Sequence, residues 1–165
     1  MPTAGLEAAL AGVLIGLVPY HLEPGDSTRE ARLRLLAHEM AALPPAVSAG
    51  LIMVGQSESG FAAYVAAGCL EPPRGAPRCD ADKQGQPQAL GYWQLHRSVC
   101  PAAWAFPPWT LESLREQIAC AARLWERAAW RCLPRGGGFG CGWVKRSWSQ
   151  AWYSSILARL PVERQ

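Results

Sequence analysis

Apolar residues recur along this chain at helical spacing, and the clearest case is the stretch 45–57. These residues are apolar nearly all round a helix, which is typical of a helix buried at the centre of a domain. Pro44 and Pro45 end the segment before it, and proline is well tolerated in the first turn of a helix. We therefore predict a central buried helix over 45–57.

Two amphipathic helices are predicted ahead of it. The first covers the apolar stretch 6–18, and the residues from 19 to 26 interrupt it with Pro and Gly. The second covers 28–42. Ser27 and Glu30 have the spacing of a capping box, with Ser27 as the N-cap. Its inner face is predicted from residues that repeat every three or four positions: Leu33, Leu36, Ala37, Met40 and Ala41.

Two further helices are predicted in the second half. Thr110 is a good N-cap for a helix over 110–132, and a last helix is predicted over 147–160. The expected inner positions are Leu111, Leu114, Ile118, Ala121, Trp125 and Ala128 in the former, and Trp148, Trp152, Ile156 and Leu160 in the latter.

The segments between these helices are rich in residues that break regular structure. Residues 68–88 contain many Gly, Pro and Asp residues and predict a long loop, with or without a short hairpin. Residues 90–95 predict a short strand or an extended turn, and the glycines of 135–142 exclude regular structure there. The predicted fold class is mainly α.

The chain has 165 residues, enough for one domain with its own core. We expect a single domain over 1–165, with its core at about 28–160 and a first helix and linker at 1–26. Half of the residues are apolar and 18% are charged, which excludes a disordered chain.

Charge and hydropathy limit the kinds of partner that we expect this protein to bind. The net charge is +3, and Lys and Arg form no run or stripe, so we expect no nucleic acid. A mildly basic surface fits an anionic polymer. The stretch 6–18 includes Glu7, is too short to span a membrane, and lacks the basic start of a signal peptide.

Six cysteines stand at loop-scale spacings without a C-x-x-C pair, which argues against a zinc ribbon and for disulfides in an oxidising compartment. Sequence alone allows 15 ways to pair six cysteines. Local pairing is our prediction, the alternative being free buried thiols. The expected pairs are Cys69 with Cys79, Cys100 with Cys120, and Cys132 with Cys141.

Glu58 stands at the end of the central helix, in the sequence Gln-Ser-Glu-Ser-Gly-Phe. Burial disfavours the charged form of a carboxyl group, so we expect Glu58 to stay protonated, as cleavage of a glycosidic bond requires. Downstream, residues 90–95 read Leu-Gly-Tyr-Trp-Gln-Leu. Together the two segments resemble the Glu-Ser and Gly-x-x-Gln motifs of the lytic transglycosylase and goose-type lysozyme superfamily.

This resemblance covers roughly residues 28–160 and implies a lysozyme-like α domain with a substrate cleft beside the central helix. It implies that Glu58 protonates the glycosidic oxygen, that Ser59 orients the acid or a sugar, and that Gly91, Tyr92 and Gln94 hold the glycan. Trp93 has two interpretations of equal weight, glycan contact and core packing. Phe61 is expected in the core.

The Ala-Tyr-Asn-x-Gly motif of many lytic transglycosylases is absent, and Tyr153 is the candidate that could replace its tyrosine. A hydrolase also needs a second carboxylate to manage water. Asp80 and Asp82 could serve, although aspartates in polar loops are more often turn residues. A transglycosylase of this superfamily works with one Glu, because the sugar's own N-acetyl and 6-hydroxyl groups complete the reaction.

We therefore expect a lytic transglycosylase that cuts the β-1,4 bond between N-acetylmuramic acid and N-acetylglucosamine in peptidoglycan. The alternatives are a muramidase of the same fold and a non-catalytic wall-binding or virion protein. This reaction needs no cofactor, and the three histidines are scattered, so no metal site is expected. We expect a monomer in an extracytoplasmic setting: the periplasm, the cell wall or a phage particle.

Overall fold

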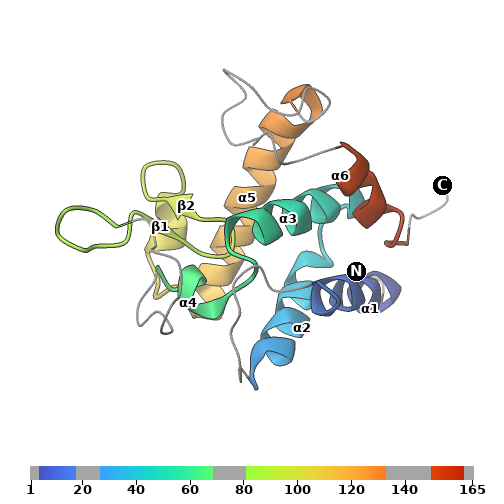
Figure 1. Ribbon diagram of the computed structural model, residues 1–165, viewed down its shortest axis with the longest axis horizontal. Helices are drawn as coiled ribbons and strands as arrows, with labels where there is room; N and C mark the ends of the chain where they lie inside the picture. The colour runs from blue at the N-terminus through green and yellow to red at the C-terminus, as the bar shows by residue number, and fades with distance from the viewer. Residues whose placement is uncertain (1–3, 18–26, 69–80, 133–149, 162–165) are drawn as a thin grey trace.

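The computed structural model describes residues 4–17, 27–68, 81–132 and 150–161, and its architecture is mainly helical, as predicted (Figure 1). Two very short strands form one antiparallel hairpin in which Leu90 pairs with Leu95. The elements in chain order are α1 (Ala4–Ile15), α2 (Arg29–Met40), α3 (Pro45–Glu58), α4 (Ala63–Ala66), β1 (Ala89–Leu90), β2 (Leu95–His96), the 3-10 helix η1 (Pro101–Trp104), α5 (Leu111–Cys132) and α6 (Gln150–Leu157).

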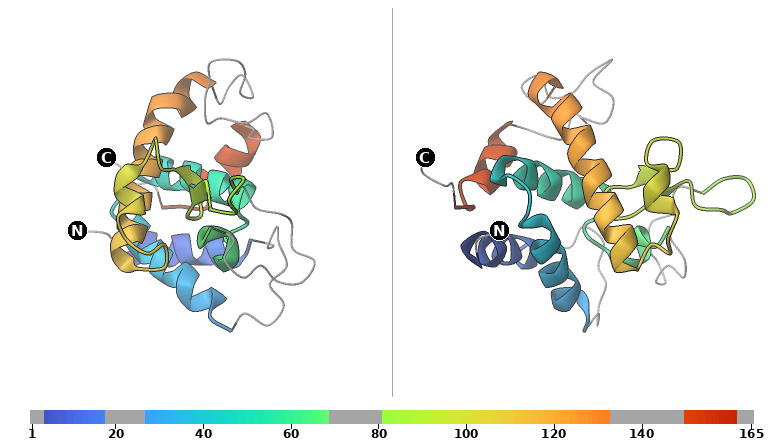
Figure 2. Two further views of the ribbon diagram at one scale, coloured as in Figure 1. Left: turned by 90° about the vertical axis from the view of Figure 1, so that its left-hand side faces the viewer. Right: turned by 180° about the vertical axis from the view of Figure 1, so that it is seen from behind.

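The central buried helix is present, and every residue from Val47 to Gly55 in α3 is buried. Proline stands in its first turn, where its missing N–H costs nothing. Helices α5 and α6 pack against α3, and α1 packs against α2. Figures 1 and 2 show α5 crossing α3, with the hairpin and α4 near one end of α3 and α6 near the other.

Two glycines let aromatic rings come close to the backbone of α3. A Cβ atom added at Gly50 would lie 2.1 Å from the ring of Trp125, and one added at Gly55 would lie 2.5 Å from the ring of Phe61. Both rings are buried. A side chain at either glycine would therefore overlap a packed ring, which costs stability in a dense core.

The two predicted N-caps have different outcomes. Thr110 caps α5 as expected, because its hydroxyl accepts a hydrogen bond from the backbone N–H of Ser113 at 3.2 Å. The capping box at α2 is a wrong prediction. Thr28, not Ser27, occupies the N-cap position, and it does so in a helical conformation without a side-chain cap hydrogen bond. Its hydroxyl instead accepts from Arg32 Nε at 3.4 Å.

The buried faces of the last two helices follow the predicted spacing in part: Leu114 and Trp152 are only partly buried against the core, and the side chain of Ala128 lies outside the described part. Ile118, Ala121 and Trp125 are buried on α5. Leu111 is 36% exposed and lines a surface pocket instead, so its prediction as a core residue is wrong. On the final segment Ile156 and Leu160 are buried. Trp148 and the segment 135–142 lie outside the described residues.

One of the three predicted disulfides is confirmed. Cys100, just before η1, is bonded to Cys120 in α5, with Cα atoms 6.0 Å apart. This bond ties η1 and the hairpin to the long helix. The other two pairs, Cys69 with Cys79 and Cys132 with Cys141, rest on side chains outside the described part. Among the described helices, none combines the length and apolarity needed to cross a membrane.

Candidate functional site

The chain reverses direction sharply where α3 ends, just after Glu58. The N–H of Ser59 donates to the carbonyl of Gly55 at 3.0 Å, and the N–H of Gly60 donates to the same oxygen at 3.1 Å. Gly60 has a φ of 59° and Phe61 a φ of 57°. The left-handed backbone ends the helix, so the side chain of Ser59 enters the core while Glu58 stays at the helix end.

The Gly-x-x-Gln motif forms the loop of the hairpin. The N–H of Gln94 donates to the carbonyl of Gly91 at 3.2 Å, and the side-chain Nε2 of Gln94 donates to that carbonyl at 3.0 Å and to the carbonyl of Val65 at 3.1 Å. The N–H of Gly91 donates to the carbonyl of Ala66 at 2.8 Å. Gln94 thus holds the turn against α4, and its amide nitrogen is already used inside the protein.

Ser59 connects the two motifs directly. Its side chain is fully buried, and its hydroxyl donates a hydrogen bond to the carbonyl of Tyr92 at 2.8 Å. The same oxygen accepts from the N–H of Phe61 at 3.1 Å. The residue after Glu58 is therefore joined to the middle of the Gly91–Gln94 turn. Burial places Ser59 as a support of the turn rather than as a contact for a sugar.

Backbone strain is concentrated in these two segments. Among the described residues, the non-glycine positions with positive φ are Phe61 at 57° and Gln94 at 49°. A side chain in the left-handed region is uncommon and costs energy, and such strain gathers at functional sites. The strained residues lie in the two segments that the sequence singled out for their chemistry.

Glu58 is partly buried at the last position of α3. Its carboxylate atom Oε1 is shielded from solvent, while the side chain as a whole keeps some exposure. The buried helix fixes the position of this residue, and part of its side chain reaches the surface.

The two aromatic residues of the turn have separate roles. Trp93 is fully buried and its indole Nε1 donates to the carbonyl of Leu51 at 2.9 Å, so of its two interpretations the structure supports core packing. The ring of Tyr92 packs 5.5 Å from that of Phe61, centroid to centroid, and Phe61 is in the core as expected. The side chain of Tyr92 lines a pocket that is described below.

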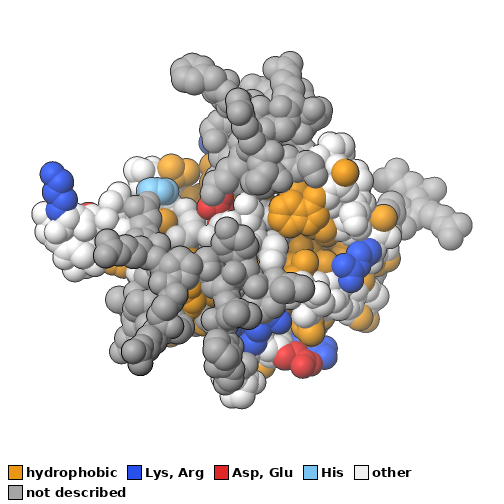
Figure 3. Space-filling view, in the orientation of Figure 1, with side chains coloured by type: hydrophobic (Ala, Val, Ile, Leu, Met, Phe, Trp, Pro, Cys, Tyr) orange, Lys and Arg blue, Asp and Glu red, His pale blue; other side chains and the backbone are white. Residues whose placement is uncertain are grey.

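The structure does not bring Tyr153 to this site. Its hydroxyl donates to the carbonyl of Ala46 at 3.2 Å, in the first turn of α3, roughly 18 Å along the helix from Glu58 at 1.5 Å per residue. Its ring packs against Trp125, and burial raises the pKa of Tyr153. Figure 3 shows hydrophobic side chains gathered where α3 meets α6.

Of the two candidate second carboxylates, the structure describes only Asp82. One of its oxygens, Oδ1, accepts from the N–H of Gln84 at 2.9 Å and from that of Gln86 at 2.8 Å. This is the turn-forming role of aspartate, and Asp82 is exposed. Asp80 lies outside the described residues.

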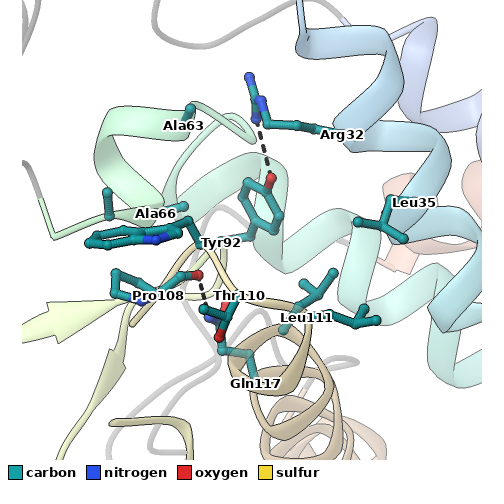
Figure 4. Close-up of a pocket in the computed structure, with 12 residues that line it drawn as sticks. Arg32, Leu35, Ala63, Ala66, Tyr92, Pro108, Thr110, Leu111 and Gln117 are labelled. Atoms are coloured by element: carbon teal, nitrogen blue, oxygen red, sulfur yellow. Dashed lines mark hydrogen bonds between the residues drawn. The ribbon is translucent and has the colours of Figure 1, made fainter. Parts of the chain in front are cut away.

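A pocket of about 120 Å³ lies on the side of the turn where Tyr92 faces α2 (Figure 4). The hydroxyl of Tyr92 accepts a hydrogen bond from Arg32 Nη1 at 3.2 Å, so the turn is also held to α2. Trp109 lines this pocket and is 71% exposed. Glu58 is not part of its wall, nor of the wall of a larger pocket beside the hairpin.

Gln117 is a site residue that the sequence analysis missed. It is 1% exposed on α5, and its Nε2 donates to Ser113 Oγ at 3.0 Å and to the carbonyl of Pro108 at 3.3 Å. A Cβ atom added at Gly91 would lie 2.2 Å from Gln117 Oε1. The sequence did contain a signal, because a polar residue falls on the apolar stripe of α5.

Within the described ranges, no three His, Cys, Asp or Glu side chains come together in a way that could hold a metal ion. Comparison of the chain with protein-family models, with curated proteins and with solved structures gives no match in any of the three.

Proposed function

We propose that this protein is a lytic transglycosylase that cleaves the β-1,4 bond between N-acetylmuramic acid and N-acetylglucosamine in peptidoglycan. The observation that carries the proposal is the hydrogen bond from the Ser59 hydroxyl to the Tyr92 carbonyl. It joins the Glu-Ser pair to the Gly-x-x-Gln turn, and these two motifs are 33 residues apart in sequence. The choice of reaction rests on the resemblance of both motifs to those of peptidoglycan-cleaving enzymes.

In the proposed reaction Glu58 first donates its proton to the glycosidic oxygen as the bond from that oxygen to C1 of the muramoyl sugar breaks. The sugar's own N-acetyl oxygen stabilises the charge at C1. Glu58 then accepts the proton of the 6-hydroxyl as that oxygen bonds to C1. The product is a 1,6-anhydro sugar. Glu58 is protonated again at the end of the reaction, and no second carboxylate takes part.

The structure around these two motifs also supports the proposal. A catalytic acid needs a fixed position, and Glu58 ends a helix that is buried along nine consecutive residues from Val47 to Gly55. The Gly91–Gln94 turn is held by α3 through Ser59, by α2 through Arg32 and by α4 through Ala66. The Cys100–Cys120 disulfide fits an extracytoplasmic setting, because disulfides are rare in the cytosol.

The test compares Glu58→Gln with wild type on purified sacculi, with the released muropeptides identified by mass spectrometry. We expect the variant to bind the wall but to lose activity by about 10²–10⁴-fold, the usual contribution of a general acid. Glu126→Gln is the matched control, because Glu126 is an exposed residue of α5. It should leave both activity and melting temperature unchanged.

Each outcome has a distinct meaning. Anhydro products from wild type identify a transglycosylase, whereas products that carry one added water identify a muramidase of the same fold. Wall binding without any product identifies a non-catalytic wall-binding or virion protein. Full activity of Glu58→Gln would refute the catalytic assignment.

A further inference from the structure

A second pocket, of about 470 Å³, opens beside the hairpin on the strand that comes after the Gly-x-x-Gln turn. Most of its lining residues are polar, among them Gln86 and Gln88 from the preceding loop and His96, Arg97 and Ser98 from β2 and the residues after it. His96 is two residues past Gln94, which corresponds to about 7 Å along a strand. The pocket therefore lies next to the Gly91–Gln94 turn in the chain, although none of the four turn residues is part of its wall.

The positively charged side chain of Arg97, in the wall of this pocket, is held in place by an aromatic ring. The guanidinium carbon of Arg97 lies 5.1 Å from the centre of the Trp104 ring, within the range of a cation–π contact. Trp104 is fixed in turn, because its Nε1 donates to the carbonyl of Leu95 at 3.0 Å. The disulfide at Cys100 anchors the same segment to α5.

No carboxylate of the described residues lies within ion-pair distance of Arg97. Asp82 shares the pocket wall, but its Oδ1 atom accepts two backbone hydrogen bonds within its own loop. The ring contact orients the guanidinium without neutralising it. Within the described part of the chain Arg97 is thus oriented, exposed and not paired with an acid. Such an arginine suits a ligand carboxylate, which it can bind through two parallel hydrogen bonds.

We propose that this pocket binds the acidic stem peptide of peptidoglycan, with Arg97 contacting a peptide carboxylate and the Gln86 and Gln88 amides contacting the peptide backbone. This proposal rests on the proposed function and names the part of the substrate that lies beyond the glycan. The stem peptide branches from the lactyl group of muramic acid. The proposal places the glycan at the neighbouring Gly91–Gln94 turn, with the stem peptide extending from it into the pocket.

The test uses one glycan in two forms: strands with their stem peptides, and the same strands after an amidase has removed the peptides. We expect wild type to cleave the peptide-bearing strands with the higher kcat/KM. Arg97→Gln should lose about tenfold on these strands, the effect of one charge-assisted hydrogen bond, and should cleave the stripped strands like wild type. Lys83→Gln is the control, since it removes the same charge from an exposed residue outside the pocket wall.

A second measurement does not depend on activity. Calorimetric titration of the Glu58→Gln protein with a soluble muramoyl peptide should show binding, which the added Arg97→Gln substitution weakens about tenfold. Equal effects of Arg97→Gln on both substrate forms, or peptide binding that does not depend on Arg97, would overturn the pocket proposal while leaving the role of Glu58 intact. An active Glu58→Gln enzyme would instead overturn the proposed function, and the titration would still report on the pocket.

Discussion

Replacing Gly91 by alanine is the sharpest test of how the hairpin turn is built. Gly91 has a φ of 80°, a conformation that L-residues adopt at a cost of about 1–2 kcal/mol. The new methyl group would also lie 2.2 Å from Oε1 of the buried Gln117. Because that contact is far too short, Gln117 has to move.

The size of the effect depends on the hydrogen bonds that Gln117 loses. Its amide donates to Ser113 Oγ and to the Pro108 carbonyl, and each such hydrogen bond contributes about 1 kcal/mol. With the backbone cost, Gly91→Ala should lower the free energy of unfolding by about 3 kcal/mol. For a chain of this size, that corresponds to a fall in melting temperature of roughly 6–12 °C.

Gly85→Ala is the matched control for the backbone part. Gly85 has a φ of 76°, and nothing lies within 4 Å of an added Cβ atom. This variant should therefore lose only about 1 kcal/mol. Chemical denaturation followed by circular dichroism measures both variants. A loss at Gly91 no larger than that at Gly85 would refute the proposed clash.

The clash can also be isolated by a double-mutant cycle. Gln117→Ala removes the side chain that blocks the new methyl group, so the cost of Gly91→Ala should be smaller in this background than in wild type. Strictly additive losses would show that the two residues do not interact.

Two further predictions concern contacts between distant segments. Removing the disulfide by replacing Cys100 and Cys120 with serine should cost about 3 kcal/mol, the entropy of closing a loop of this length, and an unchanged denaturant midpoint would count against the bond. At the surface, hydrogen bonding and attraction from Arg115 hold the pKa of Glu39 below its ordinary 4.5. The contribution of this pair is therefore present at neutral pH and is lost as the pH falls below 4.5. Glu39→Gln should accordingly destabilise the protein more at pH 7 than at pH 3 in urea titrations, and equal losses at the two pH values would contradict this.

The parts of the fold that the sequence predicted are those with local signals. Helix α3 was predicted within one residue because Pro45 marks its start and an apolar run fills its length. Thr110 marks the start of α5 by a hydrogen bond to a residue three positions away. The prediction of a capping box at α2 is wrong, although Ser27 has the right spacing. The chain enters α2 in a helical conformation, and Arg32 donates to the Thr28 hydroxyl.

The candidate site was predicted less completely, because its contacts join residues far apart in the sequence. The motifs located Glu58 and the turn, but not the hydrogen bond by which Ser59 joins them. Trp93 could not be assigned to core or surface until the Leu51 carbonyl was placed beside it. Tyr153 has no local feature that reveals which end of α3 it contacts.

The rings that lie against α3 also determine what can move in this molecule. Trp125 and Phe61 occupy the places of absent side chains at Gly50 and Gly55, and these glycines are about 140° apart around the helix axis at 3.6 residues per turn. Any rotation of the helix drives a side chain into one ring or the other. The helix end from which Glu58 extends is therefore fixed from two sides, so a change in the direction of its carboxyl group has to come from rotation about its own side-chain bonds.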